Sequence, residues 1–212
     1  MRKDPDLPAR LRQGLTVLGL SLPDDGVNRL LAYVALLSRW NAAYNLTAVR
    51  DPAEMVPRHL LDSLAILPRV SGPRLLDVGT GPGLPGIPLA IADPTLRVTL
   101  LDANGKKVRF CRQAVFELGL GNVEVVQGRV EAYRSAVAFA TITARAVADL
   151  PSLVAGVRHL LGPDTTLLAM KGALPEAEMA RLRAEGFSVS AHPLRVPDVE
   201  GERHLIEIRA AS

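Results

Sequence analysis

The sequence predicts an α/β protein, in which a helical segment precedes a mostly parallel seven-stranded sheet that ends in an antiparallel hairpin. Three observations predict this fold. From Arg74 onward, short apolar runs alternate with segments of helical spacing, as in parallel sheets that are covered on both faces. The last two strand-like runs have no helical segment between them. Residues 1–70 show helical spacing throughout.

The N-terminal region reads as three helices. The first covers residues 7–20, the second begins with Pro23 and two acids and runs to Tyr44, and the third is capped by Asp51 and Pro52. Ser71, Gly72 and Pro73 then break the pattern. We therefore expect two regions, an N-terminal helical extension over residues 1–70 and the sheet domain over residues 71–212.

The sheet domain begins with an apolar run that ends in glycines. Strands are expected at 75–78, 96–101, 123–126, 139–143, 165–170, 187–194 and 204–209, and helices at 84–92, 106–118, 150–161 and 176–185. Within the helix at 84–92, Pro85 is expected in the first turn, where proline is tolerated.

Length and composition bound the function. The 212 residues are 48% hydrophobic and 22% charged, which allows a sizeable core. A single cysteine, Cys111, excludes an intrachain disulfide framework and a cysteine-cluster metal site. The net charge of +3 permits a polyanionic partner without demanding one. We find neither a targeting segment nor an apolar run that could span a bilayer, so we expect no membrane contact. The single cysteine fits a reducing cytoplasm. We also expect a monomer without a bound metal.

The glycine-rich turn after the first strand is the most informative segment. Gly81, Gly83 and Gly86 satisfy the dinucleotide pattern G-x-G-x-x-G. Asp77, Gly79, Gly81 and Gly83 satisfy a second pattern, acid-x-G-x-G-x-G, which resembles motif I of methyltransferases. We favour the second pattern, because Asp77 would repel a pyrophosphate but suits a cofactor with an ammonium and a sulfonium group. An NAD-dependent oxidoreductase remains the alternative.

The order of strands and helices, with its closing hairpin, resembles the Rossmann-like fold of class I S-adenosylmethionine-dependent methyltransferases. That resemblance implies roles for acids and turns at the carboxyl ends of the strands. Asp102, at the end of the second strand, can accept hydrogen bonds from ribose hydroxyls. After the third strand, Val130 is expected to pack on the adenine and the Glu131 backbone to meet its edge.

The end of the fourth strand indicates the acceptor. Many amino-group methyltransferases have an Asn/Asp-Pro-Pro-aromatic motif there, and this chain has Thr143-Ala144-Arg145 instead. A ring nitrogen loses no proton on methylation and needs no base. The missing motif therefore favours a ring-nitrogen nucleophile, with Arg145 orienting a base or a phosphate. The catalytic residues stay unknown, since no general base is required.

Several segments resemble the bacterial small-subunit rRNA guanine-N7 methyltransferase family, also called glucose-inhibited division protein B. They are Asn45-Leu46-Thr47-Ala48-Val49, Arg58-His59-Leu60-Leu61-Asp62-Ser63-Leu64, the glycine loop with Leu84-Pro85-Gly86-Ile87-Pro88, Leu101-Asp102 with Gly105-Lys106-Lys107, Ala144-Arg145-Ala146-Val147, Lys171-Gly172 and Arg203-His204-Leu205-Ile206. The resemblance covers nearly the whole chain. It implies transfer of a methyl group from S-adenosylmethionine to N7 of a guanine in 16S rRNA, in a loop near the decoding site.

The resemblance also implies which residues bind. Cofactor contacts are expected at Gly79, Leu84, Val130, Glu131 and Arg145. The RNA, within the 30S subunit or its precursor, is expected to meet basic residues near the sheet's ligand edge, namely Arg58, His59, Lys106, Lys107, Arg109 and Lys171. A class I methyltransferase for another RNA or a small molecule, and a non-catalytic ribosome assembly factor, are the remaining alternatives.

Overall fold

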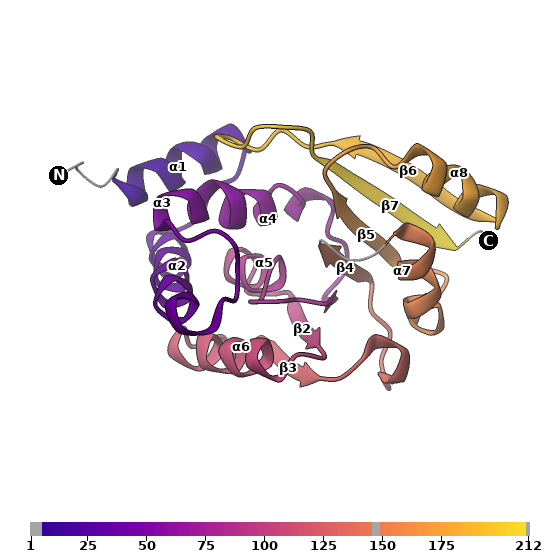
Figure 1. Cartoon of the computed structure of the whole chain (residues 1–212), viewed down its shortest axis with the longest axis horizontal. Helices are drawn as coiled ribbons and strands as arrows, with labels where there is room; N and C mark the ends of the chain where they lie inside the picture. The colour runs from indigo at the N-terminus through magenta and orange to yellow at the C-terminus, as the bar shows by residue number, and fades with distance from the viewer. Residues whose placement is uncertain (1–5, 146–148, 211–212) are drawn as a thin grey trace.

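The computed structural model describes residues 6–145 and 149–210. The fold is a single seven-stranded sheet between layers of helices (Figure 1). The strand order is β3-β2-β1-β4-β5-β7-β6, with β1 to β5 parallel and β7 antiparallel to both of its neighbours. The strands are β1 (Arg74–Val78), β2 (Arg97–Asp102), β3 (Val123–Gln127), β4 (Thr141–Arg145), β5 (Thr166–Lys171), β6 (Phe187–Pro193) and β7 (His204–Ala210). The predicted sheet with its terminal hairpin is confirmed.

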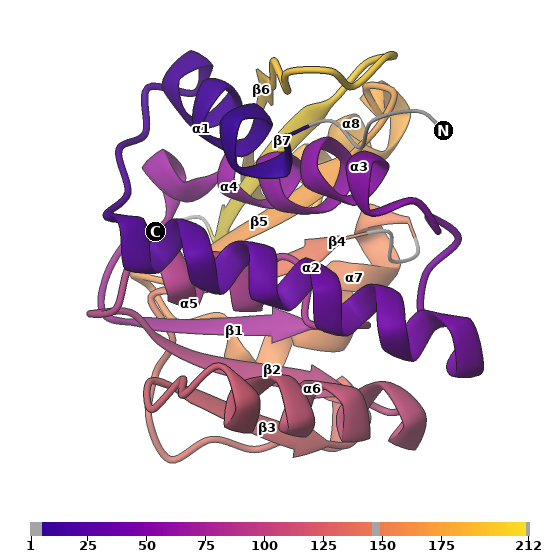
Figure 2. The same ribbon diagram turned by 90° about the vertical axis from the view of Figure 1, so that its left-hand side faces the viewer.

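The helices divide between the two faces of the sheet (Figures 1 and 2). One face carries α5 and α6, with the N-terminal helices packed over them, and the other carries α7 and α8. The α-helices are α1 (Leu7–Val17), α2 (Asp24–Tyr44), α3 (Pro52–Met55), α4 (Asp62–Leu64), α5 (Gly86–Ala92), α6 (Gly105–Glu117), α7 (Leu150–Val157) and α8 (Glu176–Ala184), with a π-helical segment η1 (Val56–Leu61) between α3 and α4 and short 3-10 turns η2 (Leu67–Arg69), η3 (Val130–Ala132) and η4 (Arg158–Leu160). No helix within the described ranges is long and apolar enough to cross a membrane.

Alternating residues of the strands supply two separate cores. Leu75 and Leu100 face α5 and α6, while Leu76 and Leu101 face α7 and α8. Because both faces are covered, the strands are apolar on both sides and lack the alternation of a half-exposed sheet.

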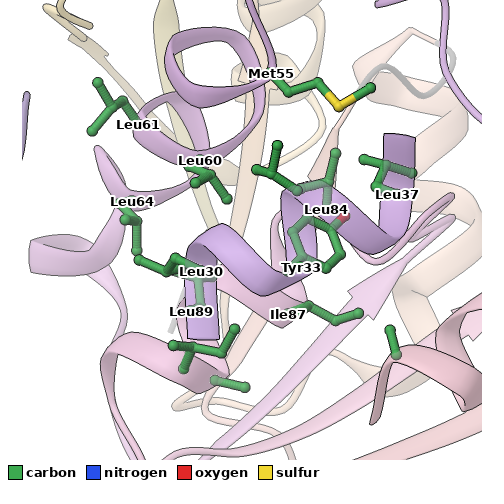
Figure 3. Packing of buried hydrophobic residues seen from close by; sticks show 14 of the residues in the cluster. Leu30, Tyr33, Leu37, Met55, Leu60, Leu61, Leu64, Leu84, Ile87 and Leu89 are labelled. Carbon is green, nitrogen blue, oxygen red and sulfur yellow. The ribbon is translucent and has the colours of Figure 1, made fainter. Parts of the chain in front are cut away.

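The N-terminal helices share the first of these cores. Leu30, Tyr33 and Leu37 of α2 pack against Leu84 and Ile87 beside the glycine loop (Figure 3). The Tyr33 hydroxyl also donates a hydrogen bond to the carbonyl of Pro82 in that loop, at 2.8 Å. The helical segment is therefore tied directly to the turn at the end of β1, while a boundary at residue 70 stays a prediction.

The helix expected at 7–20 ends at Val17, and the helix expected at 150–161 ends at Val157. Two further differences lie beside the glycine loop and the end of β4. The helix expected from residue 84 begins at Gly86, because Gly83 and Leu84 still donate to the Thr80 carbonyl in the preceding turn. Pro85 therefore precedes the helix and is not in its first turn. The strand expected at 139–143 is β4, Thr141–Arg145, so Arg145 is its last residue and does not follow it.

The third N-terminal helix is also less regular than expected. Asp51 caps it, as predicted, by accepting from the Ala53 N–H at 2.9 Å. Pro57 has no N–H for the Ala53 carbonyl, which accepts from Arg10 at 2.8 Å instead. The helix widens to the π-helical segment η1 at this point.

Candidate active site

The glycine loop joins β1 to α5 at the edge of the sheet where all five parallel strands end. Gly79 and Gly81 have φ values of 63° and 61°, which L side chains rarely adopt. At Gly86 a Cβ atom would come within 2.3 Å of Leu100 Cδ2 and 2.8 Å of Asp77 Oδ2. Gly79 is exposed, while residues 80–86 are buried, so the loop meets solvent at the end of β1.

Asp77 lies beneath this loop. Its Oδ2 accepts from the Thr80 hydroxyl at 2.5 Å and from the Gly86 N–H at 2.9 Å, and its Oδ1 accepts from the Thr143 hydroxyl at 3.2 Å. Burial raises the pKa of Asp77 to about 6, against the effect of those hydrogen bonds. The Asp77 carboxylate is fully buried, and its hydrogen bonds fix the glycine loop from the interior of the protein.

Asp102 holds the same loop from β2. Its Oδ2 accepts from the Gly81 N–H at 2.9 Å, and its Oδ1 accepts from the Asn104 N–H at 2.8 Å. The side chain of Asn104 then caps α6 by accepting from Lys106 N–H at 2.9 Å. Asp102 is 8% exposed at the strand end, so it lies at the edge where a ribose is expected.

The turn after β3 lies at the same edge of the sheet as the glycine loop and Asp102. Val130 begins the 3-10 turn η3 and is half-buried against the second core, near Gly156 of α7. Glu131, next to it, is exposed. Leu84, by contrast, is buried in the first core, so its side chain supports the loop from inside the fold.

A cavity of about 270 Å³ opens beside the glycine loop, at the ends of β4 and β5 and the start of β7. Arg145, Arg203 and Asp62 meet in its wall. Asp62 Oδ2 accepts from Arg145 Nη1 at 3.2 Å, and its Oδ1 lies 3.6 Å from Arg203 Nε. The full lining is Val49, Arg58, His59, Asp62, Arg145, Met170, Lys171, Gly172, Leu194, Arg203 and His204.

Asp62 is a buried carboxylate with an unused acceptor. The residue is 7% exposed, and no hydrogen-bond partner of Oδ1 is found in the described part of the chain. Burial raises the pKa of Asp62, while Arg145 opposes that rise. The carboxylate thus balances two guanidinium groups, one at the end of β4 and one just before β7.

His59 lies in the wall of the same cavity, and both of its ring nitrogens have hydrogen-bond partners within the protein. Its Nδ1 lies 3.0 Å from the Arg58 carbonyl and its Nε2 lies 2.9 Å from the Thr47 hydroxyl. Burial, aided by Arg145, lowers the pKa of His59 to about 4, so the ring is neutral at pH 7. In the neutral ring, Nδ1 donates to the carbonyl and Nε2 accepts from Thr47. Contact between His59 and RNA stays a prediction.

The other residues predicted to meet RNA divide into two groups. Arg58 is exposed at the cavity, and Lys171 lines it while lying 3.4 Å from Glu178. Lys106 and Arg109 are exposed on α6, and Lys107 is half-buried there; none of the three lines the cavity. Ala146 and Val147, which belong to the matched segment around Arg145, lie outside the described residues.

Sequence reasoning assigned no role to Asp62 or Arg203, although both stand in the matched segments. The signal for Asp62 was a single acid in the apolar run from Leu60 to Leu64. An acid in such a run must find a partner or lose its charge. Within residues 6–145 and 149–210, no cluster of histidine, cysteine, aspartate and glutamate side chains could hold a metal ion.

The fold is that of the class I, S-adenosylmethionine-dependent methyltransferases. Among solved structures, the chain is similar to the glycopeptide N-methyltransferase MtfA complexed with S-adenosylmethionine, with a TM-score of 0.63 at 15% identity, over 73% of this chain and 88% of that one. It is also similar to a precorrin-6y C5,15-methyltransferase from Geobacter metallireducens, with a TM-score of 0.58 at 14% identity, over 80% of this chain and 92% of that one.

The family follows from sequence comparison. The model of the GidB family, rRNA small subunit methyltransferase G, matches residues 27–206. Proteins named ribosomal RNA small subunit methyltransferase G are 53% identical in Xanthomonas axonopodis pv. citri, over 97% of this chain and 96% of the relative, and in Marinobacter nauticus, over 98% and 97%. The chain belongs to the rRNA small subunit methyltransferase G family.

Proposed function

We propose that this protein transfers a methyl group from S-adenosylmethionine to N7 of a guanine in 16S rRNA, within the 30S subunit or its precursor. The observation that carries the proposal is the cavity beside the glycine loop, whose wall holds Arg145, Arg203 and Arg58. Guanidinium groups bind phosphates and can donate to O6 of guanine, which leaves N7 free to react. The names of the relatives point to the same substrate class.

The residues at the carboxyl ends of β1, β2 and β3 fit the cofactor by their chemistry. Exposed Gly79 leaves the backbone open to a ligand, Asp102 offers carboxylate oxygens near a ribose, and Glu131 and Val130 border the adenine position. Asp77 acts from below, because its carboxylate fixes the loop through Thr80 and Gly86. The cofactor supplies a methyl group on a sulfonium, which a guanine N7 lone pair accepts without losing a proton.

The chain then needs to align the guanine rather than to remove a proton from it. Arg145 ends β4 between the glycine loop and the cavity, and Asp62 holds its guanidinium at 3.2 Å. An arginine fixed in this way orients the base, and alignment supplies much of the rate.

Transfer of labelled methyl groups tests the proposal. Cells that lack this protein supply 30S subunits, protein-free 16S rRNA and tRNA, which are incubated with the purified protein and labelled S-adenosylmethionine. We expect label in 7-methylguanosine from 30S subunits, 16S rRNA or both, and none from tRNA. Label in another nucleoside would contradict the N7 assignment. Cofactor binding without label in any RNA would favour a different acceptor or an assembly role.

A smaller proposal concerns the location and the oligomeric state, and the purified protein allows a test of the second. We propose that the protein acts as a monomer in the cytoplasm, where the small ribosomal subunit is assembled. Sedimentation at the concentrations used for the transfer assay should give a particle of 22.7 kDa. A dimer that persists at those concentrations would contradict the monomer.

A further inference from the structure

A second cavity lies next to the first, on the other side of one loop. It has a volume of about 340 Å³ and lies between the end of α2 and the segment that returns to α3. Its lining is Ser38, Asn41, Ala42, Asn45 and Arg50. The neighbouring residue Val49 lines the first cavity. Two consecutive residues, Val49 and Arg50, therefore border two cavities.

The loop between the cavities is fixed by side chains. The Asn41 amide donates to the Val49 carbonyl at 3.2 Å, and its oxygen accepts from the Thr47 N–H at 2.9 Å. Thr47 also meets His59 at 2.9 Å. Asn41 is 6% exposed, so these bonds are shielded from water. The wall between the two cavities is consequently preorganised.

The second cavity offers polar groups that the fold does not use. Asn45 and Arg50 are exposed and Ser38 is half-buried. No ion pair of Arg50, and no side-chain hydrogen bond of Asn45 or Ser38, is found in the described part of the chain. Asn45 has a φ of 50° and ends α2 in the left-handed conformation. A guanidinium, an amide and a hydroxyl in one cavity match a phosphate and the edge of a base.

We propose that this second cavity, the Asn45–Arg50 cavity, binds the nucleotide adjacent to the target guanine. Arg50 contacts its phosphate, and Asn45 and Ser38 bind the edge of its base. The inference rests on the proposed function, since it needs an RNA whose guanine enters the first cavity. Single-stranded RNA is read in this way, by binding splayed bases in separate sites. The protein would thus read two consecutive nucleotides, and not the guanine alone.

Two variants and one control test the inference on 16S rRNA. Asn45→Gly removes the amide but keeps the left-handed backbone, which glycine adopts readily. Arg50→Gln removes one charge. Arg39→Gln is the matched control, because Arg39 is exposed on α2, the helix that leads into the cavity, but pairs with Glu117 of α6 at 3.1 Å. S-adenosylmethionine affinity and Tm are measured for each variant and should equal those of the wild type.

The expected result is a change in RNA recognition alone. Asn45→Gly should raise the KM for 16S rRNA by about 5- to 150-fold, the range of one lost base contact. Arg50→Gln should reduce the slope of log affinity against log salt by about one. Changing the base next to the target guanine in transcribed 16S rRNA should slow the wild type and leave Asn45→Gly unaffected.

The outcomes separate the two proposals. If the wild type methylates 16S rRNA but both variants match Arg39→Gln in KM and salt slope, the second cavity does not bind RNA. A defect that comes with lower cofactor affinity or Tm would also overturn the inference, because it would show a structural role. If the wild type labels no RNA, the proposed function itself fails.

Discussion

Two buried carboxylates illustrate how single residues shape this edge. Asp77 meets only neutral donors, and its pKa rises to about 6. Burial also raises the pKa of Asp62, but two guanidinium groups, Arg145 and Arg203, oppose that rise. The first carboxylate shapes the glycine loop, while the second balances charge in the wall of the cavity.

At Asp62, removal of the charge should affect both stability and activity. Asp62→Asn leaves two partly buried guanidinium groups without their counter-charge. Because the pairs are partly buried, we expect the free energy of unfolding to fall by about 1–3 kcal/mol, between the values for exposed and for fully buried pairs. We expect kcat/KM on 16S rRNA to fall at least about tenfold, since Arg145 loses its orientation. Urea unfolding and methyl transfer measure the two effects.

A matched control is Asp198→Asn, which removes an exposed ion pair with Arg10 at 3.0 Å. Exposed pairs contribute about 0–1 kcal/mol, so this variant should keep both stability and activity. If Asp62→Asn behaved like this control, the charge-balancing role of Asp62 would be wrong.

His59 should make stability depend on pH. Its pKa is about 4 in the fold, and lies near 6.5 in the unfolded chain. The unfolded chain thus takes up a proton first as pH falls. The stability that neutral His59 contributes is complete above about pH 6.5 and is lost as pH falls towards 4, by on the order of 3 kcal/mol.

His59→Gln isolates this contribution, because glutamine does not titrate. The difference in unfolding free energy between the wild type and His59→Gln should shrink by that amount from pH 7 to pH 4. Denaturant unfolding at several pH values measures it. A difference that stays constant over this range would show that the ring is not buried as a neutral group.

At the scale of elements, the glycine loop depends on close packing as much as on backbone conformation. Gly86 begins α5 where a Cβ would collide with Leu100 and Asp77. Gly121, in the turn before β3, has no atom within 4 Å of an added Cβ and no positive φ. The two glycines therefore form a matched pair for substitution by alanine.

Gly86→Ala should destabilise the fold by about 1–3 kcal/mol, the range for overpacking, and weaken S-adenosylmethionine binding, because the loop must shift. Gly121→Ala should change stability by under about 1 kcal/mol and leave binding intact. Thermal unfolding and cofactor titration compare them. Equal behaviour of the two variants would show that Gly86 is not confined by its neighbours.

At the scale of the whole molecule, the helical segment and the sheet act as one unit. Residues from Leu11 to Leu205 share the first core, and Tyr33 bonds to Pro82 inside the glycine loop. A ligand at the carboxyl edge should consequently stabilise the entire fold, including the N-terminal helices.

Thermal protection should also separate the two cofactor classes. A ligand at about 100 times its Kd stabilises by about 2.7 kcal/mol, which is roughly 5–10 °C in Tm for a chain of this size. S-adenosylmethionine should produce such a shift, and NAD should not. Protection by NAD alone would revive the dinucleotide interpretation of Gly81, Gly83 and Gly86.

The sequence by itself determined the order of strands and helices, the terminal hairpin and the glycine loop. These features follow from patterns among residues that are close in the chain. The patterns are apolar runs, helical spacing and glycines in a strand-to-helix turn. It also determined the family, because the matched segments extend over nearly the whole chain.

Only the tertiary structure decided which polar residues meet. Asp62, Arg145 and Arg203 come from distant parts of the chain, and no local spacing predicts their contact. Folding likewise buried His59 and Asp77, which changed their pKa values and gave them structural positions. The charge and burial of a side chain depend on its neighbours in the folded structure. Packing brings together residues that are far apart in the sequence, so local sequence patterns do not predict these neighbours.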